Sequence, residues 1–96
     1  MKTSELLDHH RKWIRRIVAS CRATNPRVFG SVLRGEDVEE SDLDILVDTT
    51  SESSIFDIGE LHYRLRGLLG VSVEVVTPDS LHVRLRLRVV AEARPV

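Results

Sequence analysis

The sequence predicts a small α/β domain in which helices and strands form layers, and three observations lead to this class. The chain has 96 residues, enough for one compact domain spanning residues 1–96 and too few for two. Two long segments carry apolar residues at helical spacing, and three short apolar segments read as strands, two of them between these helices and one after the second. We expect the order helix, strand, short helix, strand, helix, strand, helix, which is typical of a layered α/β domain.

The first helix is predicted from Thr3 to about Arg22. Thr3 or Ser4 can cap its start, because a hydroxyl there can accept a hydrogen bond from a free backbone N–H. Asn25 and Pro26 stop the helix and begin an extended stretch. The positions that recur at three- and four-residue steps are Leu6, Leu7, His10, Trp13, Ile14, Ile17, Val18 and Cys21.

A strand, a turn and a second strand follow. Arg27–Phe29 reads as a short strand that ends at Gly30, and Ser31–Gly35 as a tight turn or a single helical turn. The acidic and polar segment Glu36–Ser41 is expected to be a surface loop. The apolar run Asp42–Asp48 then forms the second strand.

The second long helix is predicted from Ile55 to about Leu69, after a Ser/Thr-rich loop at Thr49–Ser54. Gly70 ends this helix in the position that glycine usually takes. Val71–Val76 is the third strand. The apolar face expected for the helix consists of Ile55, Ile58, Leu61, Leu65 and Leu68.

The last segment fits both a strand and a helix. Apolar residues alternate with polar ones between Leu81 and Val89, which is a strand pattern. Thr77-Pro78, however, is a good helix start, and Leu81, Leu85 and Val89 also share one helical face. We therefore expect a helix over residues 78–91.

Composition narrows the functional classes. The chain is 42% hydrophobic and carries 14 basic and 15 acidic residues, so it should fold around a modest core and lacks the basic surface of a general nucleic-acid binder. The single cysteine, Cys21, cannot form an internal disulfide and is expected to be a buried helical residue. No apolar run is long enough to span a membrane and the N-terminus is not a signal peptide, so we expect a soluble cytoplasmic protein.

A possible phosphate site lies where the first strand ends. Gly30 would let a bound group approach the backbone closely. The turn after it presents backbone N–H groups and the Ser31 hydroxyl, which are suitable donors to phosphate oxygens, and Arg34 could add a cation. A Gly-Ser pair alone is also what an ordinary turn contains.

Two carboxylates stand at the start of the second strand. Asp42 and Asp44 are two residues apart, so on a strand they point to the same face, roughly 6.6 Å apart. Such a pair repels unless a cation or solvent screens it, and hard cations such as Mg²⁺ favour oxygen ligands. The alternative is a solvated strand edge.

A third carboxylate lies in the predicted third strand. Glu74 stands between valines in what reads as an interior strand, where an unpaired charge would be costly to bury. A position beside Asp42 and Asp44 across the sheet would account for it. An exposed face or an ion pair with an arginine is the alternative.

Together these residues resemble the signature of DNA polymerase beta-like nucleotidyltransferases. The match consists of Gly30-Ser31, ten intervening residues, and Asp42-Leu43-Asp44. The runs Phe29–Glu36 and Ser41–Val47 look like the minimal nucleotidyltransferase branch. Val75-Val76-Thr77-Pro78, followed by Leu81 and a C-terminal helix, also fits that branch, so the resemblance covers nearly all of the chain from Pro26 onward.

The resemblance implies the nucleotidyltransferase fold, a small mixed and twisted sheet flanked by helices. It also implies two Mg²⁺ ions held by Asp42, Asp44 and Glu74, and a nucleoside triphosphate held by Gly30 and Ser31. The family more often has aspartate at the third carboxylate position. In polymerase-like relatives this third carboxylate lies near the attacking hydroxyl, which makes Glu74 the candidate to accept its proton.

The minimal branch implies a partner as well. Many of its members are antitoxins paired with a HEPN-type RNase toxin, and some transfer AMP from ATP to a tyrosine of that toxin. The resemblance therefore implies a protein adenylyltransferase with a protein partner and no membrane or direct nucleic-acid contact. The alternatives are an antitoxin that neutralises its partner by binding alone, and a transferase acting on a small molecule or an RNA end.

The remaining polar and aromatic residues suggest structural roles. The four histidines have no cysteine partner at metal-ligand spacing, and His10 is expected to pack on the first helix while the others lie on the surface. Trp13 and Phe56 are expected in the core or at a subunit interface. The arginines expected on a solvated face are Arg84, Arg86 and Arg88.

Overall fold

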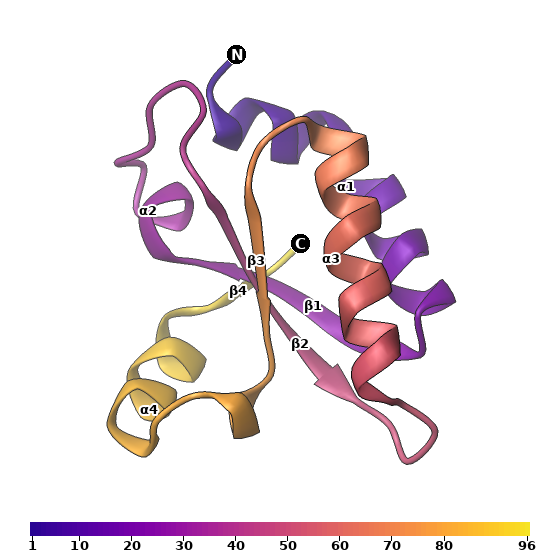
Figure 1. The fold of residues 1–96 in the computed structure, drawn as a ribbon. Helices are drawn as coiled ribbons and strands as arrows, with labels where there is room; N and C mark the ends of the chain where they lie inside the picture. Colours follow the sequence, from indigo (N-terminus) through magenta and orange to yellow (C-terminus); the bar gives the residue numbers. More distant parts are fainter.

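The computed structural model describes residues 1–96 and contains the predicted alternation of helices and strands (Figure 1). The elements are α1 (Thr3–Ser20), β1 (Ala23–Phe29), α2 (Gly30–Leu33), β2 (Leu43–Thr49), α3 (Ile55–Leu69), β3 (Val73–Val76), the 3₁₀ helix η1 (Pro78–Ser80), α4 (Val83–Glu92) and β4 (Arg94–Pro95). None of the helices combines the length and apolar character that crossing a bilayer requires.

The four strands form one mixed sheet in the order β3-β2-β1-β4. β1 pairs antiparallel with both β2 and β4, whereas β2 and β3 are parallel. Parallel neighbours need a crossover connection, and α3 provides it between β2 and β3. The mixed sheet flanked by helices, which the family resemblance implied, is confirmed.

The core lies mainly between the sheet and the pair α1 and α3, which cover one face in Figure 1. Leu43, Ile45 and Val47 alternate along β2 and are fully buried on this side. Leu46 points to the other face, where it packs in a smaller cluster with Val89 and Ala93 at the C-terminal end of α4. The residues of β2 between the core positions therefore face away from α1 and α3.

The bounds predicted for α3 are confirmed. The hydroxyl of Ser54 accepts a hydrogen bond from the Asp57 N–H at the start, and Gly70 ends the helix with a left-handed φ of 71°. Ile55 is 82% exposed, so the prediction that it belongs to the buried face is wrong; the capping turn holds it outside the sheet. The buried residues of α3 are Leu61, Leu65 and Leu69.

The start of α1 is capped by a distant residue. The sequence suggested that Thr3 or Ser4 caps the helix with its side chain, and this prediction is wrong. The N-cap position is Lys2. Instead, the Ser4 N–H donates to Asp37 Oδ2 at 2.8 Å. Asp37 is buried, so the prediction of a wholly exposed loop at Glu36–Ser41 is wrong there, because its carboxylate satisfies a free N–H of α1.

The C-terminal segment is helical but divided. η1 ends at Ser80, and α4 begins only at Val83, after His82 accepts a hydrogen bond from the Arg84 N–H through Nδ1 at 3.3 Å. The prediction of a continuous helix over 78–91 is therefore corrected to two helices. The apolar face expected for it is only partly buried, since Val89 is buried and Leu85 is half exposed.

Strand β4 was not predicted. It contains two residues, one of them proline, so it carries no alternating pattern. Pairing with β1 defines it, and the Val96 N–H donates to the Pro26 carbonyl at 3.0 Å just beyond it.

Two aromatic side chains were expected in the core or at a subunit interface, and the structure excludes the core. Trp13 is 54% exposed and Phe56 is 84% exposed; an interface position for them stays a prediction. The guanidinium of Arg16 lies over the Trp13 ring, 5.1 Å from its centroid. Cys21 is buried and free, as predicted.

Candidate active site

Asp44 and Glu74 are direct neighbours across the parallel pair β2 and β3. Asp42 precedes Asp44 by two residues, where β2 begins, and so belongs to the same side of the sheet. This side faces away from α1 and α3, because Leu43 and Ile45 point into the core between them. The structure thus brings the three predicted carboxylates to one end of one sheet face.

The Asp44 carboxyl group is in the least solvated position of the three. Its side chain is partly buried, whereas Asp42 and Glu74 are exposed. Burial raises the pKa of Asp44 to about 6, with further contributions from the negative charges of Glu74 and Asp42, and Arg34 opposes the shift. Negative charge is therefore concentrated at this point of the sheet.

Glu74 reaches this face from an edge strand. The sequence suggested an interior strand, but the sheet order places β3 at one edge. Glu74 is exposed, so its charge needs no buried partner. Its alternation with Val73 and Val75, which pack toward the core, explains the apolar neighbours that made the strand read as interior.

Gly30 places the turn that the sequence predicted to bind phosphate against Asp44. Phe29, the last residue of β1, pairs with Asp44, and Gly30 follows with a φ of 77°, a conformation that favours glycine. A Cβ atom at Gly30 would collide with Asp44 Oδ2 and lie only 3.2 Å from its Cγ. The close approach of backbone and carboxylate therefore requires glycine at this position.

Ser31 lies in the single turn of α2, which matches the predicted helical turn. Its side chain is partly buried and its hydroxyl makes no hydrogen bond within the chain. Its carbonyl accepts the Glu36 N–H at 2.9 Å, which fixes the turn. The hydroxyl is thus available to a bound group beside the carboxylates.

Arg34 is exposed, and its guanidinium is engaged by two acidic side chains. Nη1 lies 2.8 Å from Glu92 Oε1 in α4, and Nε donates to Glu36. The hydrogen bonds that the guanidinium donates to the carboxylates of Glu36 and Glu92 raise the pKa of Arg34 above its ordinary value. Arg34 therefore joins the turn of α2 to α4, and a phosphate would have to compete with Glu92 and Glu36 for it.

A groove of about 420 Å³ opens beside the carboxylates. It is lined by Asp42, His62, Ser72, Val73, Glu74 and Val75. His62 was expected to be an ordinary surface residue, and the structure places it in this groove opposite the β3 edge. The sequence gives no signal for this, because the position depends on how α3 packs beside β3.

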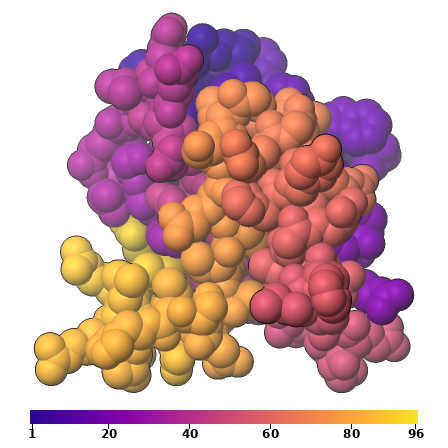
Figure 2. Space-filling view, in the orientation of Figure 1, coloured from indigo at the N-terminus to yellow at the C-terminus, as the bar shows by residue number.

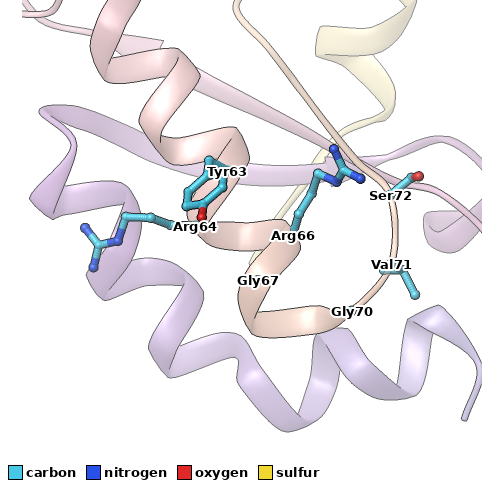
Figure 3. A pocket seen from close by; sticks show the side chains of 7 residues that line it. All are labelled: Tyr63, Arg64, Arg66, Gly67, Gly70, Val71 and Ser72. Atoms are coloured by element: carbon cyan, nitrogen blue, oxygen red, sulfur yellow. The ribbon is translucent and has the colours of Figure 1, made fainter.

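A second hollow of about 610 Å³ adjoins the groove through Ser72, which lines both. Figure 3 shows its wall, in which Tyr63 and Arg66 project from α3 and Ser72 from the segment leading into β3. The remaining lining residues are Arg64, Gly67, Gly70 and Val71.

The three carboxylates suit divalent cations in their donor chemistry. They offer only oxygen ligands, which Mg²⁺ prefers. Burial, together with the negative charges of Glu74 and Asp42, raises the pKa of Asp44, and a cation bound there would offset both effects. No group of three or more acidic, His or Cys side chains lies close enough together to hold a metal ion by itself. Mg²⁺ commonly binds through one or two carboxylates with water and substrate phosphates completing its shell, so this arrangement fits such a site.

Comparison with known proteins identifies the family. Residues 11–96 match the nucleotidyltransferase domain family. The chain is 42% identical over 66 residues to a Methanocaldococcus jannaschii protein assigned as a protein adenylyltransferase. The match covers 69% of this chain and 71% of the relative. It is 48% identical over 54 residues to the protein adenylyltransferase MntA of Thermococcus cleftensis, covering 56% and 54% of the two chains.

Solved structures agree with this result. A structure assigned as a minimal nucleotidyltransferase superposes with a TM-score of 0.87 at 42% identity, covering 97% of this chain and 95% of that one. A toxin–antitoxin complex with AMP-PNP contains a chain with the same fold, with a TM-score of 0.74 at 23% identity over 88% of this chain and 69% of that one. The family resemblance read from the sequence is confirmed: the chain belongs to the nucleotidyltransferase domain family, as a minimal nucleotidyltransferase similar to protein adenylyltransferases.

Proposed function

We propose that this chain transfers AMP from ATP to a hydroxyl group of a partner protein and thereby neutralises it. The observation that carries the proposal is the meeting of Asp42, Asp44 and Glu74 on one sheet face, beside the turn at Gly30. The backbone N–H groups and the hydroxyl of the turn can donate to the triphosphate oxygens. A carboxylate beside them can accept the proton of the attacking hydroxyl. The relatives described as protein adenylyltransferases support a protein as acceptor.

In this proposal the N-terminal turn of α2 holds the triphosphate. The Ser31 hydroxyl and the backbone N–H groups of the turn donate to phosphate oxygens, and the missing side chain at Gly30 lets them approach. The acceptor oxygen forms a bond to the α-phosphorus while the bond from that phosphorus to the pyrophosphate oxygen breaks. Pyrophosphate leaves, and Glu74 accepts the proton of the hydroxyl.

Asp42, Asp44 and Glu74 would hold two Mg²⁺ ions. Bound there, these ions would offset the negative charge of the phosphates and of the attacking and leaving oxygens. Among the three carboxylates, Asp44 is the central one of the proposed metal site, because it lies between Glu74 on the next strand and the backbone of Gly30. Glu74 is exposed at the sheet edge, so an acceptor can reach it from solvent.

We further propose that the partner is a HEPN-type RNase toxin and that the accepting hydroxyl belongs to a tyrosine. Two observations on similar proteins support a toxin as partner: solved MntA–HepT toxin–antitoxin complexes share this fold, and one toxin–antitoxin complex was solved with AMP-PNP. Tyrosine is the acceptor that the family resemblance implies.

The test is the intact mass of the protein encoded next to this chain's gene, after incubation with the chain, ATP and Mg²⁺. We expect a gain of one or more AMP units, and peptide mapping should locate them on tyrosine. The Asp42→Asn, Asp44→Asn double variant should give no gain, whereas the matched pair Asp8→Asn, Glu52→Gln, at exposed positions on α1 and in the loop before α3, should act like the parent chain. An unchanged mass with a stable complex would favour neutralisation by binding alone.

A further inference from the structure

The outward side of α4 carries apolar side chains in a row. Val83, Leu87 and Val90 lie four and three residues apart, so they follow one another along one side of the helix. Their exposed fractions are 57%, 73% and 43%, and apolar surface left in water costs free energy. In Figure 2 the C-terminal part of the chain, orange to yellow, projects from the body of the molecule. These three residues form the α4 stripe.

The orientation of α4 is fixed by contacts on its other side. The Arg86 guanidinium donates to the carbonyls of Pro78 at 2.6 Å and Leu81 at 3.2 Å. Near the end of the helix, Val89 is buried in the small cluster that contains Leu46 of the sheet. The side of α4 that carries Val89 therefore faces the sheet, and the α4 stripe faces solvent.

α4 stands on the sheet face that carries the carboxylates. Leu46, which packs against α4, and Asp44 are two residues apart on β2, so both side chains point to the same side. Figure 1 shows α4 on the side of the sheet opposite α1 and α3. The end of α4 also contacts the turn of α2, because Arg34 donates to Glu92 at 2.8 Å. A protein bound to α4 would therefore lie beside the carboxylates.

Two unpaired arginines flank the α4 stripe. Arg84 and Arg88 are exposed and lie one turn apart on the same side of it, as expected for a solvated face. Neither takes part in an ion pair. Arg86, also expected on a solvated face, is instead half-buried and hydrogen-bonded to backbone carbonyls. A partner that covers the α4 stripe therefore meets two positive charges, which acidic side chains would complement.

This combination favours a helix of another protein as the occupant. An apolar stripe along a helix packs well against a second helix, because the side-chain ridges of one fit between those of the other. A second copy of α4 does not complement the surface, since its only acidic residue, Glu92, is engaged by Arg34. A nucleic acid would contact the arginines and leave the α4 stripe in water.

We propose that the acceptor protein docks on α4 through an amphipathic helix, whose apolar residues cover the α4 stripe and whose acidic residues pair with Arg84 and Arg88. The inference rests on the proposed function, for which it names the surface that recognises the protein substrate. Docking there holds the acceptor beside Asp44, so its accepting hydroxyl reaches the carboxylates from a bound state. The α4 stripe acts in recognition and takes no part in the chemical step.

Binding affinity tests the α4 stripe. The probe is the protein encoded next to this chain's gene, titrated into the full chain without ATP in a calorimeter. Leu87→Gln should raise the Kd at least about tenfold, because a polar side chain replaces the apolar centre of the contact. Leu87 is exposed, so the melting temperature should stay near that of the parent chain. Ile55→Gln, at an exposed apolar position on α3, is the matched control, and an equal Kd in both variants would overturn the proposal.

Salt dependence tests the two arginines. The Kd of the parent chain should rise with NaCl concentration, because salt screens the pairing with acidic side chains. The double variant Arg84→Gln, Arg88→Gln should bind at least about tenfold more weakly at low salt and lose most of this dependence. Lys12→Gln, Arg16→Gln, at exposed positions with the same spacing on α1, is the control and should bind like the parent chain. A salt dependence that survives in the Arg84 and Arg88 variant would contradict the proposed pairing.

Transfer kinetics separate docking from chemistry. Leu87→Gln should raise the KM for the acceptor, while kcat and the KM for ATP stay near those of the parent chain. A fall in kcat at saturating acceptor would assign Leu87 to the structure of the active site and would contradict a role in docking.

The two proposals fail in distinguishable ways. If the wild-type chain transfers no AMP while the α4 variants weaken the complex, the proposed function fails and the docking surface stands. If transfer occurs and the Kd does not depend on α4, the function stands and the docking proposal fails. Self-association of the isolated chain that Leu87→Gln abolishes would assign the α4 stripe to a second copy. Leu87-dependent binding to phosphatidylserine vesicles would assign it to a lipid surface, and either result would overturn the proposal.

Discussion

The backbone of Gly30 lies directly against the carboxylate of Asp44. The contact arises because β1 and β2 are antiparallel neighbours, with Phe29 opposite Asp44, and the chain turns at Gly30 with a positive φ. The turn proposed to bind phosphate and the partly buried carboxylate are thus held as one unit by the sheet register. Their relative position does not depend on a loop.

Gly30→Ala should damage both stability and activity. The left-handed φ costs an alanine roughly 1 kcal/mol, and the collision with Asp44 should add about 1–3 kcal/mol by displacing the carboxylate or the turn. Chemical denaturation and AMP transfer measure the two effects.

Gly35→Ala is the matched control for this substitution. Gly35 also has a positive φ, of 72°, but a Cβ atom there meets nothing within 4 Å. The Gly35→Ala variant should therefore lose only the stability that the left-handed φ costs an alanine, and its AMP transfer should continue. Equal loss of transfer in both variants would show that the Gly30–Asp44 contact has no special role.

Asp44→Asn should stabilise the chain at neutral pH when divalent cations are absent. The folded pKa of Asp44, about 6, lies above its ordinary value of 3.8, so the folded state binds this proton more tightly. The free energy of unfolding of the parent chain should therefore fall as pH rises from about 4 to about 6 and stay low above that. The shift corresponds to at most about 3 kcal/mol, and water at this partly buried side chain reduces the effect.

Denaturation curves at several pH values in EDTA check this prediction. The asparagine variant should lack the fall between pH 4 and 6, and Mg²⁺ with an ATP analogue should stabilise the parent chain more than the variant. Identical pH profiles for the two proteins would contradict the raised pKa of Asp44.

Much of this site could be read from the sequence because its parts have local signals. The glycine at a strand end, the Asp42/Asp44 spacing and the period of α3 each follow from short-range geometry. That Asp44 and Glu74 lie next to each other was expected on weaker grounds, since their pairing depends on the parallel register of β2 and β3. That register depends on how α3 crosses between the strands.

The features that could not be predicted all involve contacts between distant segments. Asp37 is buried because the start of α1 lies beside it, and β4 exists only because β1 offers an edge. His62 reaches the groove through the packing of α3 beside β3. A pattern within ten or fifteen residues carries no information on such pairings.

Glu74→Gln should reduce AMP transfer by about 10²–10⁴-fold, because the amide cannot accept the proton of the acceptor hydroxyl. Glu74→Asp keeps a carboxylate and should retain part of the activity. The residue is exposed, so neither change should alter the melting temperature appreciably. Single-turnover transfer rates distinguish the two variants; equal rates in Gln, Asp and parent proteins would remove Glu74 from the site.

Arg34 and Glu92 should have opposite effects on ATP binding. Glu92→Gln weakens one of the two attachments of Arg34 and should lower the KM for ATP, since the guanidinium becomes freer to meet phosphate. Arg34→Ala should raise that KM about tenfold, the value of a charge-assisted hydrogen bond. If both substitutions leave the KM for ATP unchanged, Arg34 serves only to join α2 to α4.

Asp37→Ala should destabilise the chain by about 1 kcal/mol, because the Ser4 N–H at the start of α1 loses its acceptor. The hydrogen bond from that N–H lowers the pKa of Asp37 below its ordinary value. Its contribution is therefore complete above about pH 4 and is lost as pH falls through the folded pKa. Glu39→Ala, in the exposed part of the same loop, is the control for thermal denaturation at pH 7 and pH 3.

The most direct test of the central claim is the intact mass of the partner protein after incubation with this chain, ATP and Mg²⁺. The account predicts a gain of whole AMP units that disappears with Asp42→Asn and Asp44→Asn together. An unmodified partner, or a gain that persists in the double variant, would contradict the assignment of Asp42, Asp44 and Glu74 as the centre of AMP transfer.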